Sequence, residues 1–198
     1  MTGVRSKKES GQKEVLSFKS AKAWQAWLKA NHDCSSGVWL QIQKKDSVEE
    51  SPTYAEALDV ALCYGWIDGQ KNSNDESSWL QKFTPRRPRS AWSKKNTEHA
   101  ERLIRAGKMK PSGLAEIETA KKDGRWKAAY DSPSNTTIPE DFLKALKKNK
   151  KAEVFFKSLN KTNLYSIAYR LQTAKTPETR EKRMKVILEM MAKAEKFH

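Results

Sequence analysis

Residues 51–69, SPTYAEALDVALCYGWIDG, hold the start of a helix, its end and the beginning of a strand. Thr53 and Glu56 have the spacing of a capping box, in which the threonine hydroxyl accepts a hydrogen bond from the first helical turn and the glutamate accepts one from the cap residue. Gly65 is the residue type that most often ends a helix in the left-handed conformation. The segment 66–69 begins with Trp and Ile, which favour strands. The sequence therefore predicts a short helix that passes directly into a strand.

Further strands and helices are predicted on both sides of this helix. Apolar runs predict strands over residues 15–18, 38–42 and 79–83. We expect the strand at 79–83 to pair with the one at 66–69 as an antiparallel hairpin. Helix start signals are found at three further places, Ser20, Ser93 and Pro111. The sequence therefore predicts an α+β fold, in which a domain of residues 15–130 packs helices on a small antiparallel sheet.

The chain beyond this domain is predicted to be helical and basic. Residues 131–137 are rich in Pro, Ser, Asn and Thr and are expected to form a linker. Four helices are predicted in the C-terminal helical segment, residues 138–198, the third capped by Thr162 and the last by Thr176. This segment is also the most basic third of the chain. At the other end, residues 1–14 are polar and are expected to form a disordered tail.

The composition favours a cytoplasmic protein with anionic partners. The 198 residues carry 39 Lys and Arg against 24 Asp and Glu, and a net charge of +15 favours association with anions. Only two cysteines occur, which excludes a disulfide framework and a four-cysteine zinc site. No apolar run approaches the length of a membrane span, and the first residues lack the apolar centre of a secretion signal. We therefore expect no membrane span and a reducing compartment.

A stiff basic turn is the strongest candidate for a ligand site. Two prolines hold Arg86 and Arg87 at low entropic cost, and Ser93 is predicted to start a helix directly after them. The free amides at a helix start favour phosphate or carboxylate, and guanidinium groups match both. Trp92 either stacks on a flat ligand or covers the core. The predicted anion pocket comprises Arg86, Arg87, Trp92, Ser93 and Asn96.

Two acidic residues, Asp68 and Asp75, flank one arm of the predicted hairpin and are expected to support this pocket. One of Arg86 and Arg87 is expected to pair with Asp68, while the other faces solvent and binds the anion. The alternative interpretation is a structural salt bridge that only holds the turn in place. A further alternative is an uncharacterised enzyme that uses the region of Asp68, Asp75 and Arg86.

The cysteines and histidines predict no metal site and no catalytic centre. Cys63 is expected on the polar face of its helix with Glu56 and Asp59, at the C-terminal end, where the helix dipole and the acids oppose thiolate formation. Residues 32–34, His-Asp-Cys, are adjacent, and adjacent residues rarely supply three metal ligands with good geometry. The sequence contains no Ser-His-Asp set, phosphate-binding loop or dinucleotide fingerprint. We therefore predict no cofactor, no metal and no catalytic residue.

Long ungapped stretches of the chain resemble one protein family. Residues 54–69 are YAEALDVALCYGWIDG, residues 83–96 are FTPRRPRSAWSKKN, and residues 174–183 are AKTPETREKR. These stretches resemble the YdeI/OmpD-associated family, also called bacteriocin-protection proteins, over roughly residues 15–195. The family names imply a part in tolerance of antimicrobial peptides and a link to an outer-membrane porin. The resemblance implies no enzymatic activity, and it transfers no catalytic residue to this chain.

Three functions are compatible with these features. The first is a non-enzymatic cytoplasmic protein of stress or antimicrobial-peptide tolerance that binds an anionic small molecule or an anionic protein partner. The second is a nucleic-acid-binding module, which is favoured by the net charge and by Arg and Trp in one turn. The third is the uncharacterised enzyme described above. Weak nucleic-acid binding is expected in any case, because acidic residues partly neutralise the last helix.

Overall fold

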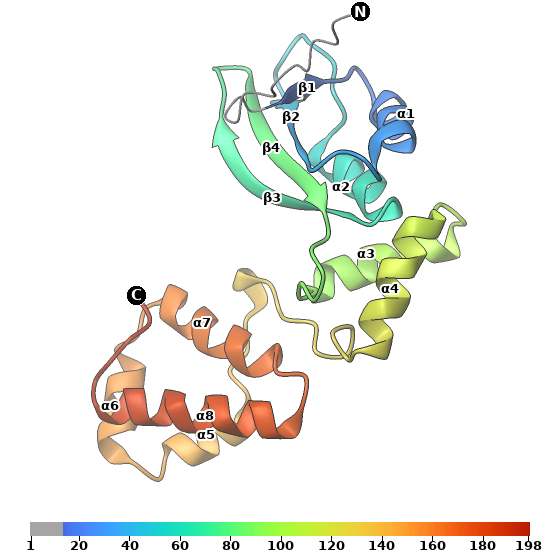
Figure 1. Cartoon of the computed structure of the whole chain (residues 1–198). Helices are drawn as coiled ribbons and strands as arrows, with labels where there is room; N and C mark the ends of the chain where they lie inside the picture. The colour runs from blue at the N-terminus through green and yellow to red at the C-terminus, as the bar shows by residue number, and fades with distance from the viewer. Residues whose placement is uncertain (1–13) are drawn as a thin grey trace, which may run out of the picture. The chain divides into compact units, whose positions relative to one another are not determined.

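The chain divides into two compact units (Figure 1). The computed structural model describes residues 14–198, so nearly all of the predicted tail, residues 1–14, lies outside the described residues. Unit 1 comprises the described residues up to Arg86 together with Lys108–Leu114, and unit 2 comprises Arg87–Gly107 together with Ala115–His198. The division into a domain of residues 15–130, a linker and a helical segment stays a prediction.

Unit 1 is built on a four-stranded sheet. Its strands lie side by side in the order β1 (Val15–Ser17), β2 (Val38–Gln43), β4 (Ser78–Pro85) and β3 (Trp66–Ser73). The neighbours β2 and β4, and β4 and β3, are antiparallel, as predicted. β1 is parallel to β2, because the helix α1 (Ala21–Asn31) carries the chain back between them. The predicted α+β class is confirmed, with a mixed sheet in place of a purely antiparallel one.

The helix α2 (Tyr54–Cys63) begins at the predicted capping box. The Thr53 hydroxyl accepts a hydrogen bond from the Glu56 N–H at 3.3 Å, and the Glu56 carboxylate accepts one from the Thr53 N–H at 2.8 Å. Gly65 has the left-handed backbone, φ 76°, that ends the helix and starts β3. The sequence signals at both ends of this helix are thus confirmed.

Aromatic side chains fill the core between α1, α2 and the sheet. Trp24 of α1 is completely buried, and its indole N–H donates to the Ala57 carbonyl at 3.1 Å. Its ring contacts the rings of Trp66 and Phe83, with centroids 6.4 and 5.7 Å away. These contacts join α1 to α2 and to both arms of the β3–β4 hairpin, so one tryptophan connects most of unit 1.

Cys63 is buried at the end of α2, which corrects its predicted place on the polar face. Its exposed fraction is 6%, although Glu56 on the same helix is exposed. The physical reason is tertiary: the Lys110 N–H donates to the Cys63 carbonyl at 3.0 Å, so the chain directly before the helix α4 (Pro111–Lys122) covers this turn. The interpretation of Cys63 as a structural residue agrees with this burial.

Unit 2 consists of helices and connecting coil. They are α3 (Lys94–Arg105), the part of α4 (Pro111–Lys122) from Ala115 onward, the short 3₁₀ helix η1 (Pro133–Asn135), α5 (Glu140–Leu146), α6 (Lys150–Lys157), α7 (Lys161–Gln172) and α8 (Pro177–Ala192). The predicted caps Ser93 and Thr176 are confirmed. The cap of α7 is Asn160 and not Thr162, because the Asn160 side chain already accepts from the Asn163 N–H. Within residues 14–198, no helix combines the length and the apolar character that crossing a membrane requires.

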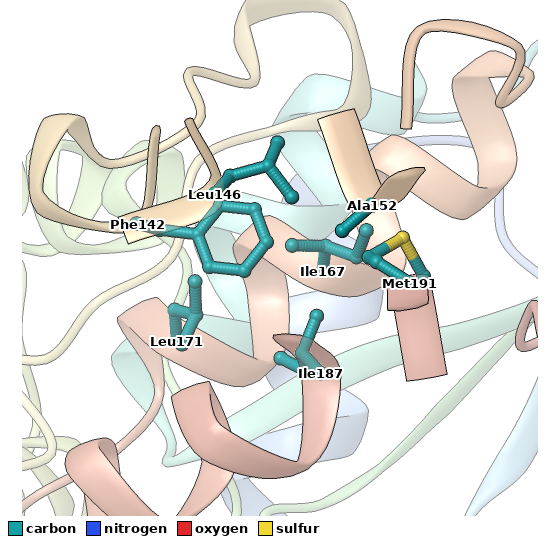
Figure 2. Close-up of a cluster of buried hydrophobic side chains, with 7 residues drawn as sticks. All are labelled: Phe142, Leu146, Ala152, Ile167, Leu171, Ile187 and Met191. Atoms are coloured by element: carbon teal, nitrogen blue, oxygen red, sulfur yellow. The ribbon is translucent and has the colours of Figure 1, made fainter. Parts of the chain in front are cut away.

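The last four helices share one apolar core. Figure 2 shows side chains from α5, α6, α7 and α8 that point toward one another, namely Phe142, Leu146, Ala152, Ile167, Leu171, Ile187 and Met191. Each is at most 2% exposed. Arg180 of α8 forms a bidentate ion pair with Asp141 at the start of α5, which supports the same packing and lowers the pKa of Asp141. The four predicted helices are therefore present and pack around one shared hydrophobic core.

Candidate anion-binding site

Three of the predicted site residues, Arg86, Asp68 and Asp75, lie in unit 1. Arg86 is only 6% exposed, and its backbone N–H donates to the Gly65 carbonyl at 3.0 Å. The Asp68 carboxylate accepts a hydrogen bond from the Tyr54 hydroxyl at 2.7 Å. Burial, together with this carboxylate, raises the pKa of Tyr54. The pairing of an arginine of the turn with Asp68 stays a prediction.

Asp75, the second predicted acid, closes the loop of the β3–β4 hairpin. Its carboxylate accepts from the backbone N–H groups of Ser77 and Ser78 at 2.8 and 2.7 Å, and from both hydroxyls at 2.9 and 2.8 Å. The hydrogen bonds from the Ser78 and Ser77 side chains lower the pKa of Asp75. This arrangement is typical of a turn residue that stabilises the loop locally.

The other four predicted site residues lie in unit 2. Arg87 is exposed, and Ser93 caps α3 by accepting from the Asn96 N–H at 3.2 Å. Trp92 is 2% exposed and packs against Trp126, with centroids 5.0 Å apart, as the interpretation of Trp92 as a core residue expects. The predicted set is therefore divided between the two units, and its role in binding an anion stays a prediction.

The basic turn itself has an unusual backbone at Arg89. The Ser90 N–H donates to the Arg87 carbonyl at 3.0 Å, which closes a four-residue turn with Pro88 at its second position. Arg89, at the third position, has φ 65°. A type II turn places a positive φ at this position and strongly favours Gly or Asn there. An arginine at this place is strained, and such strain in a native fold suggests a function for the side chain.

Arg89 lines a pocket of about 890 Å³ that lies wholly within unit 2. Its walls come from the turn at 89–91, from coil residues 125 and 128, and from α7, α8 and the chain after α8. Six of the lining residues are cationic, namely Arg89, Arg125, Arg170, Lys175, Lys182 and Arg183. None of the lining residues is acidic. The pocket therefore concentrates positive charge in a concave surface, where a bound anion is partly screened from water.

Two of these cations are held by a carboxylate behind the pocket. The Arg125 guanidinium, 3% exposed, donates to Asp123 at 2.7 Å and to the Ser90 carbonyl at 3.0 Å. Lys175 lies 3.8 Å from the same carboxylate. Partial burial alone would raise the pKa of Asp123, but the hydrogen bonds from Arg125 lower this pKa overall. Arg125 thus fixes the turn, and among residues 14–198 one carboxylate, that of Asp123, offsets the two charges.

The remaining four cations form no ion pair with a carboxylate of residues 14–198. Arg183 donates to the Arg170 carbonyl at 2.7 Å and to the Thr173 hydroxyl at 3.2 Å, which orients its guanidinium without neutralising it. The Arg170 guanidinium lies 4.2 Å from the centre of the Phe197 ring. Lys182 and Arg89 are exposed at the pocket. Four uncompensated charges are therefore available to a ligand.

The chain after α8 forms the apolar wall of the pocket. Residues 194–198, here called the strap, turn back from the helix, and Phe197 faces the pocket. Buried Asn163 holds the strap, since its side-chain oxygen accepts from the N–H groups of Phe197 and His198 at 3.0 and 3.2 Å. Val186, 48% exposed, adds a further apolar surface. The pocket can thus bind an anion that also carries an apolar or flat part.

The sequence interpretation included the turn but missed most of this pocket. Arg170, Lys182 and Arg183 appeared as solvated charges of the last two helices, and Arg125 had no recognisable motif. No local signal could have found the strained turn, because a non-glycine residue after Pro88 also fits a type I turn. No three His, Cys, Asp or Glu side chains of residues 14–198 gather as a metal site requires.

Two family models match the chain. One, described as a domain of unknown function (DUF8412), matches residues 16–116, just over half of the chain. The other, described as "Bacteriocin-protection, YdeI or OmpD-Associated", matches residues 135–194. The chain belongs to the DUF8412 family and carries a YdeI/OmpD-associated domain. No curated protein and no solved structure matches it.

The resemblance to the YdeI/OmpD-associated family is confirmed, and the matches divide its motifs. The stretch 174–183 lies in the YdeI/OmpD-associated domain, whereas the stretches 54–69 and 83–96 lie in the DUF8412 match. The pocket draws on both: the turn at 89–91 lies in the DUF8412 match, and α7 and α8 lie in the YdeI/OmpD-associated domain. Neither matched segment alone contains the complete set of cations.

Proposed function

We propose that this protein binds an anionic ligand, without catalysis, in the cationic pocket of unit 2. The single observation that carries the proposal is the gathering of six Lys and Arg residues around one concavity with no acidic lining residue. Solvated surface charges spread apart because like charges repel, so a cluster of this kind is costly unless an anion compensates it. The strained Arg89 supports the proposal, since its side chain contributes one of these charges.

The pocket favours a ligand with more than one anionic group. Lys182 and Arg183 come from α8, Arg170 from α7 and Arg89 from the turn, so the charges surround the cavity from different elements. A diphosphate or a compact polyanion can contact several of them at once. Guanidinium groups bind phosphate oxygens in a bidentate manner, and lysine binds them as a point charge. Phe197 and Val186 then contact the uncharged part of the ligand.

The cellular setting of the proposal follows from the family name and the charge. We place the protein in the cytoplasm, in tolerance of stress or antimicrobial peptides. A net charge of +15 repels a cationic peptide, so direct capture of such a peptide is disfavoured. An indirect role, through an anionic metabolite or an anionic protein partner, is consistent with both the charge and the pocket.

Calorimetric titration of the full chain with inorganic pyrophosphate tests the proposal. We expect saturable binding, and we expect the affinity of the unit 2 pocket to fall about tenfold in Lys182→Gln, because one charge-assisted contact of about 1.5 kcal/mol is lost. Lys185→Gln is the matched control: it removes the same charge from the same helix, but Lys185 lines a different groove. Its affinity for pyrophosphate is expected to stay within about twofold of the parent.

Two results contradict the proposal. The first is a calorimetric titration that shows no saturable binding of pyrophosphate or of a nucleoside diphosphate. The second is equal weakening by Lys182→Gln and Lys185→Gln, which would assign the binding to net charge alone. Tighter binding of a mixed oligonucleotide than of pyrophosphate, with a steep salt dependence, would instead support the nucleic-acid-binding module.

A further inference from the structure

We propose a second anion site, in unit 1, that binds a single phosphate group. The site is a cavity of about 440 Å³ formed by α1, the end of α2 and the start of α4. The lining residues that carry the argument are Lys29, His32, Tyr64, Lys110 and Ser112. The inference is independent of the proposed function, because none of these residues lines the pocket of unit 2.

A close backbone contact places the start of α4 at this cavity. The Lys110 N–H donates to the Cys63 carbonyl at 3.0 Å. Gly113 then passes so near that a Cβ atom at this residue would lie 2.3 Å from the Cys63 carbonyl oxygen. Only glycine allows this approach without a shift of the backbone. Gly113 therefore allows Lys110 and Ser112 to lie at the end of α2, next to Tyr64.

Ser112 has a buried hydroxyl that lacks a partner among residues 14–198. A serine near a helix start ordinarily finds a backbone or water partner, and a buried polar atom without one is unfavourable by about 1–3 kcal/mol. Ser112 is one of the residues that line the cavity, so we infer that an acceptor bound there receives the hydroxyl hydrogen.

The cavity also carries positive charge that no carboxylate compensates. Lys110 is half-buried and Lys29 is exposed at the rim, and neither forms an ion pair within the described chain. No lining residue is acidic. A half-buried ammonium group is stabilised by an anion, and lysine is a common phosphate ligand in proteins.

His32 adds a fixed imidazole to the same cavity. Its Nδ1 lies 3.0 Å from the Leu28 carbonyl oxygen, which can only accept, so Nδ1 carries a hydrogen. The ring also packs against Tyr64, with centroids 5.2 Å apart. The orientation of the ring is thereby set, and Nε2 can accept from a phosphate hydroxyl or, when protonated, donate to a phosphate oxygen.

These groups fit a tetrahedral oxyanion better than a carboxylate. Ammonium, hydroxyl and imidazole groups come from the end of α1 and from the start of α4, and they need acceptor oxygens on different sides of the ligand. A phosphate offers three or four such oxygens, whereas a carboxylate offers two in one plane. The volume also leaves room for a small substituent, so inorganic phosphate and a small phosphomonoester share the required chemistry.

A residue-resolved titration separates this site from the pocket of unit 2. We would follow backbone amide signals of the full chain by NMR while adding inorganic phosphate, and in separate arms glycerol 3-phosphate and acetate. Saturable shifts are expected in residues 29–32 and in Lys110, Ser112 and Gly113, with a larger response to either phosphate compound than to acetate. A lower dissociation constant for glycerol 3-phosphate than for inorganic phosphate would identify a phosphomonoester as the ligand.

Ser112→Ala and Lys110→Gln test the assignment, with Lys108→Gln as control. Lys108 is exposed in the same loop but does not line the cavity. We expect Ser112→Ala to melt at the same temperature as the parent or higher, because it removes an unpartnered hydroxyl, and yet to bind phosphate at least threefold more weakly. Lys110→Gln should weaken the unit 1 shifts about tenfold, and Lys108→Gln should not change them. Two results would overturn the proposal: absent or non-saturable shifts in unit 1, or the parent's phosphate affinity in both Ser112→Ala and Lys110→Gln. Either result would do so regardless of the shifts that phosphate causes in unit 2.

Discussion

Ala194 has a left-handed backbone, φ 58°, at the end of α8. The Ala194 N–H donates to the Met191 carbonyl at 3.2 Å and the Glu195 N–H to the Met190 carbonyl at 2.9 Å, which is the hydrogen-bond pattern of a Schellman cap. Glycine is preferred at this position because any Cβ atom raises the energy of the left-handed conformation. The strap that bounds the unit 2 pocket thus begins at a strained residue.

Ala194→Gly is expected to raise the free energy of unfolding by about 0.5–1 kcal/mol, since it relieves this strain at some expense in unfolded-state entropy. Denaturant unfolding measures the change. Ala192→Gly, at the last residue of α8, is the control and should lower the stability by about 0.5 kcal/mol, because glycine has a lower helix propensity than alanine. A loss of stability in Ala194→Gly would contradict the assigned backbone.

Arg89 has the same left-handed backbone, but its side chain lines the pocket. Arg89→Gly is therefore expected to raise the free energy of unfolding by about 0.5–1 kcal/mol and, at the same time, to weaken pyrophosphate binding about fivefold. Thermal melting and calorimetric titration of one variant measure both effects. A variant that binds pyrophosphate as tightly as the parent would remove Arg89 from the site.

The junction of α2 and α4 depends on the absence of a side chain at Gly113. Gly113→Ala is expected to destabilise the protein by about 1–3 kcal/mol, even though alanine favours helices, because the new methyl group would collide with the Cys63 carbonyl. Gly69→Ala provides the comparison, since its Cβ would meet Lys82 at an ordinary 3.7 Å. Equal melting temperatures for the two variants would show that the two helices do not touch in this way.

Asp131 joins the start of α3 to α7 within unit 2. Its carboxylate accepts from the Lys94 ammonium at 2.7 Å and from the Gln172 amide at 2.6 Å. Burial alone would raise the pKa of Asp131, but these contacts lower this pKa overall. A carboxylate with a lowered folded-state pKa stabilises the fold above its unfolded-state pKa, near 3.9, and this stability is lost as the pH falls through the folded-state value.

Asp131→Asn should therefore lower the stability by about 1–2 kcal/mol at pH 7, and the difference from the parent should shrink as the pH falls below about 4. Urea unfolding at a series of pH values from 7 to 3 tests this expectation. A difference that stays constant over the whole series would mean that the charge of Asp131 contributes nothing and that only its shape matters.

The net charge of +15 acts at the scale of the complete chain and predicts weak, non-specific attraction to nucleic acids. We expect a dissociation constant for duplex DNA no tighter than about 10⁻⁶ M at physiological salt, with little dependence on base sequence. Fluorescence anisotropy over a range of salt concentrations measures both properties. A nanomolar, sequence-selective complex would contradict this expectation and favour the nucleic-acid-binding module.

Local signals determined the elements of this protein. The capping box at Thr53 and Glu56, the stop at Gly65 and the caps Ser93 and Thr176 all involve contacts within about four residues, so the sequence alone specifies them. Apolar patterns likewise located the four strands and the α5–α8 core. The parallel pairing of β1 was not predictable in this way, since it depends on where the chain returns after α1.

The two candidate sites were decided by tertiary contacts. Arg89 and Lys182 meet at one pocket although more than ninety residues separate them, and His32 and Ser112 meet at the other from positions 80 residues apart. In the sequence, the charges of α7 and α8 were indistinguishable from solvated helix faces, because charge pairs three or four residues apart describe only one helix. Which face is covered, and which charges are thereby crowded together, depends on the packing of segments that no local pattern connects.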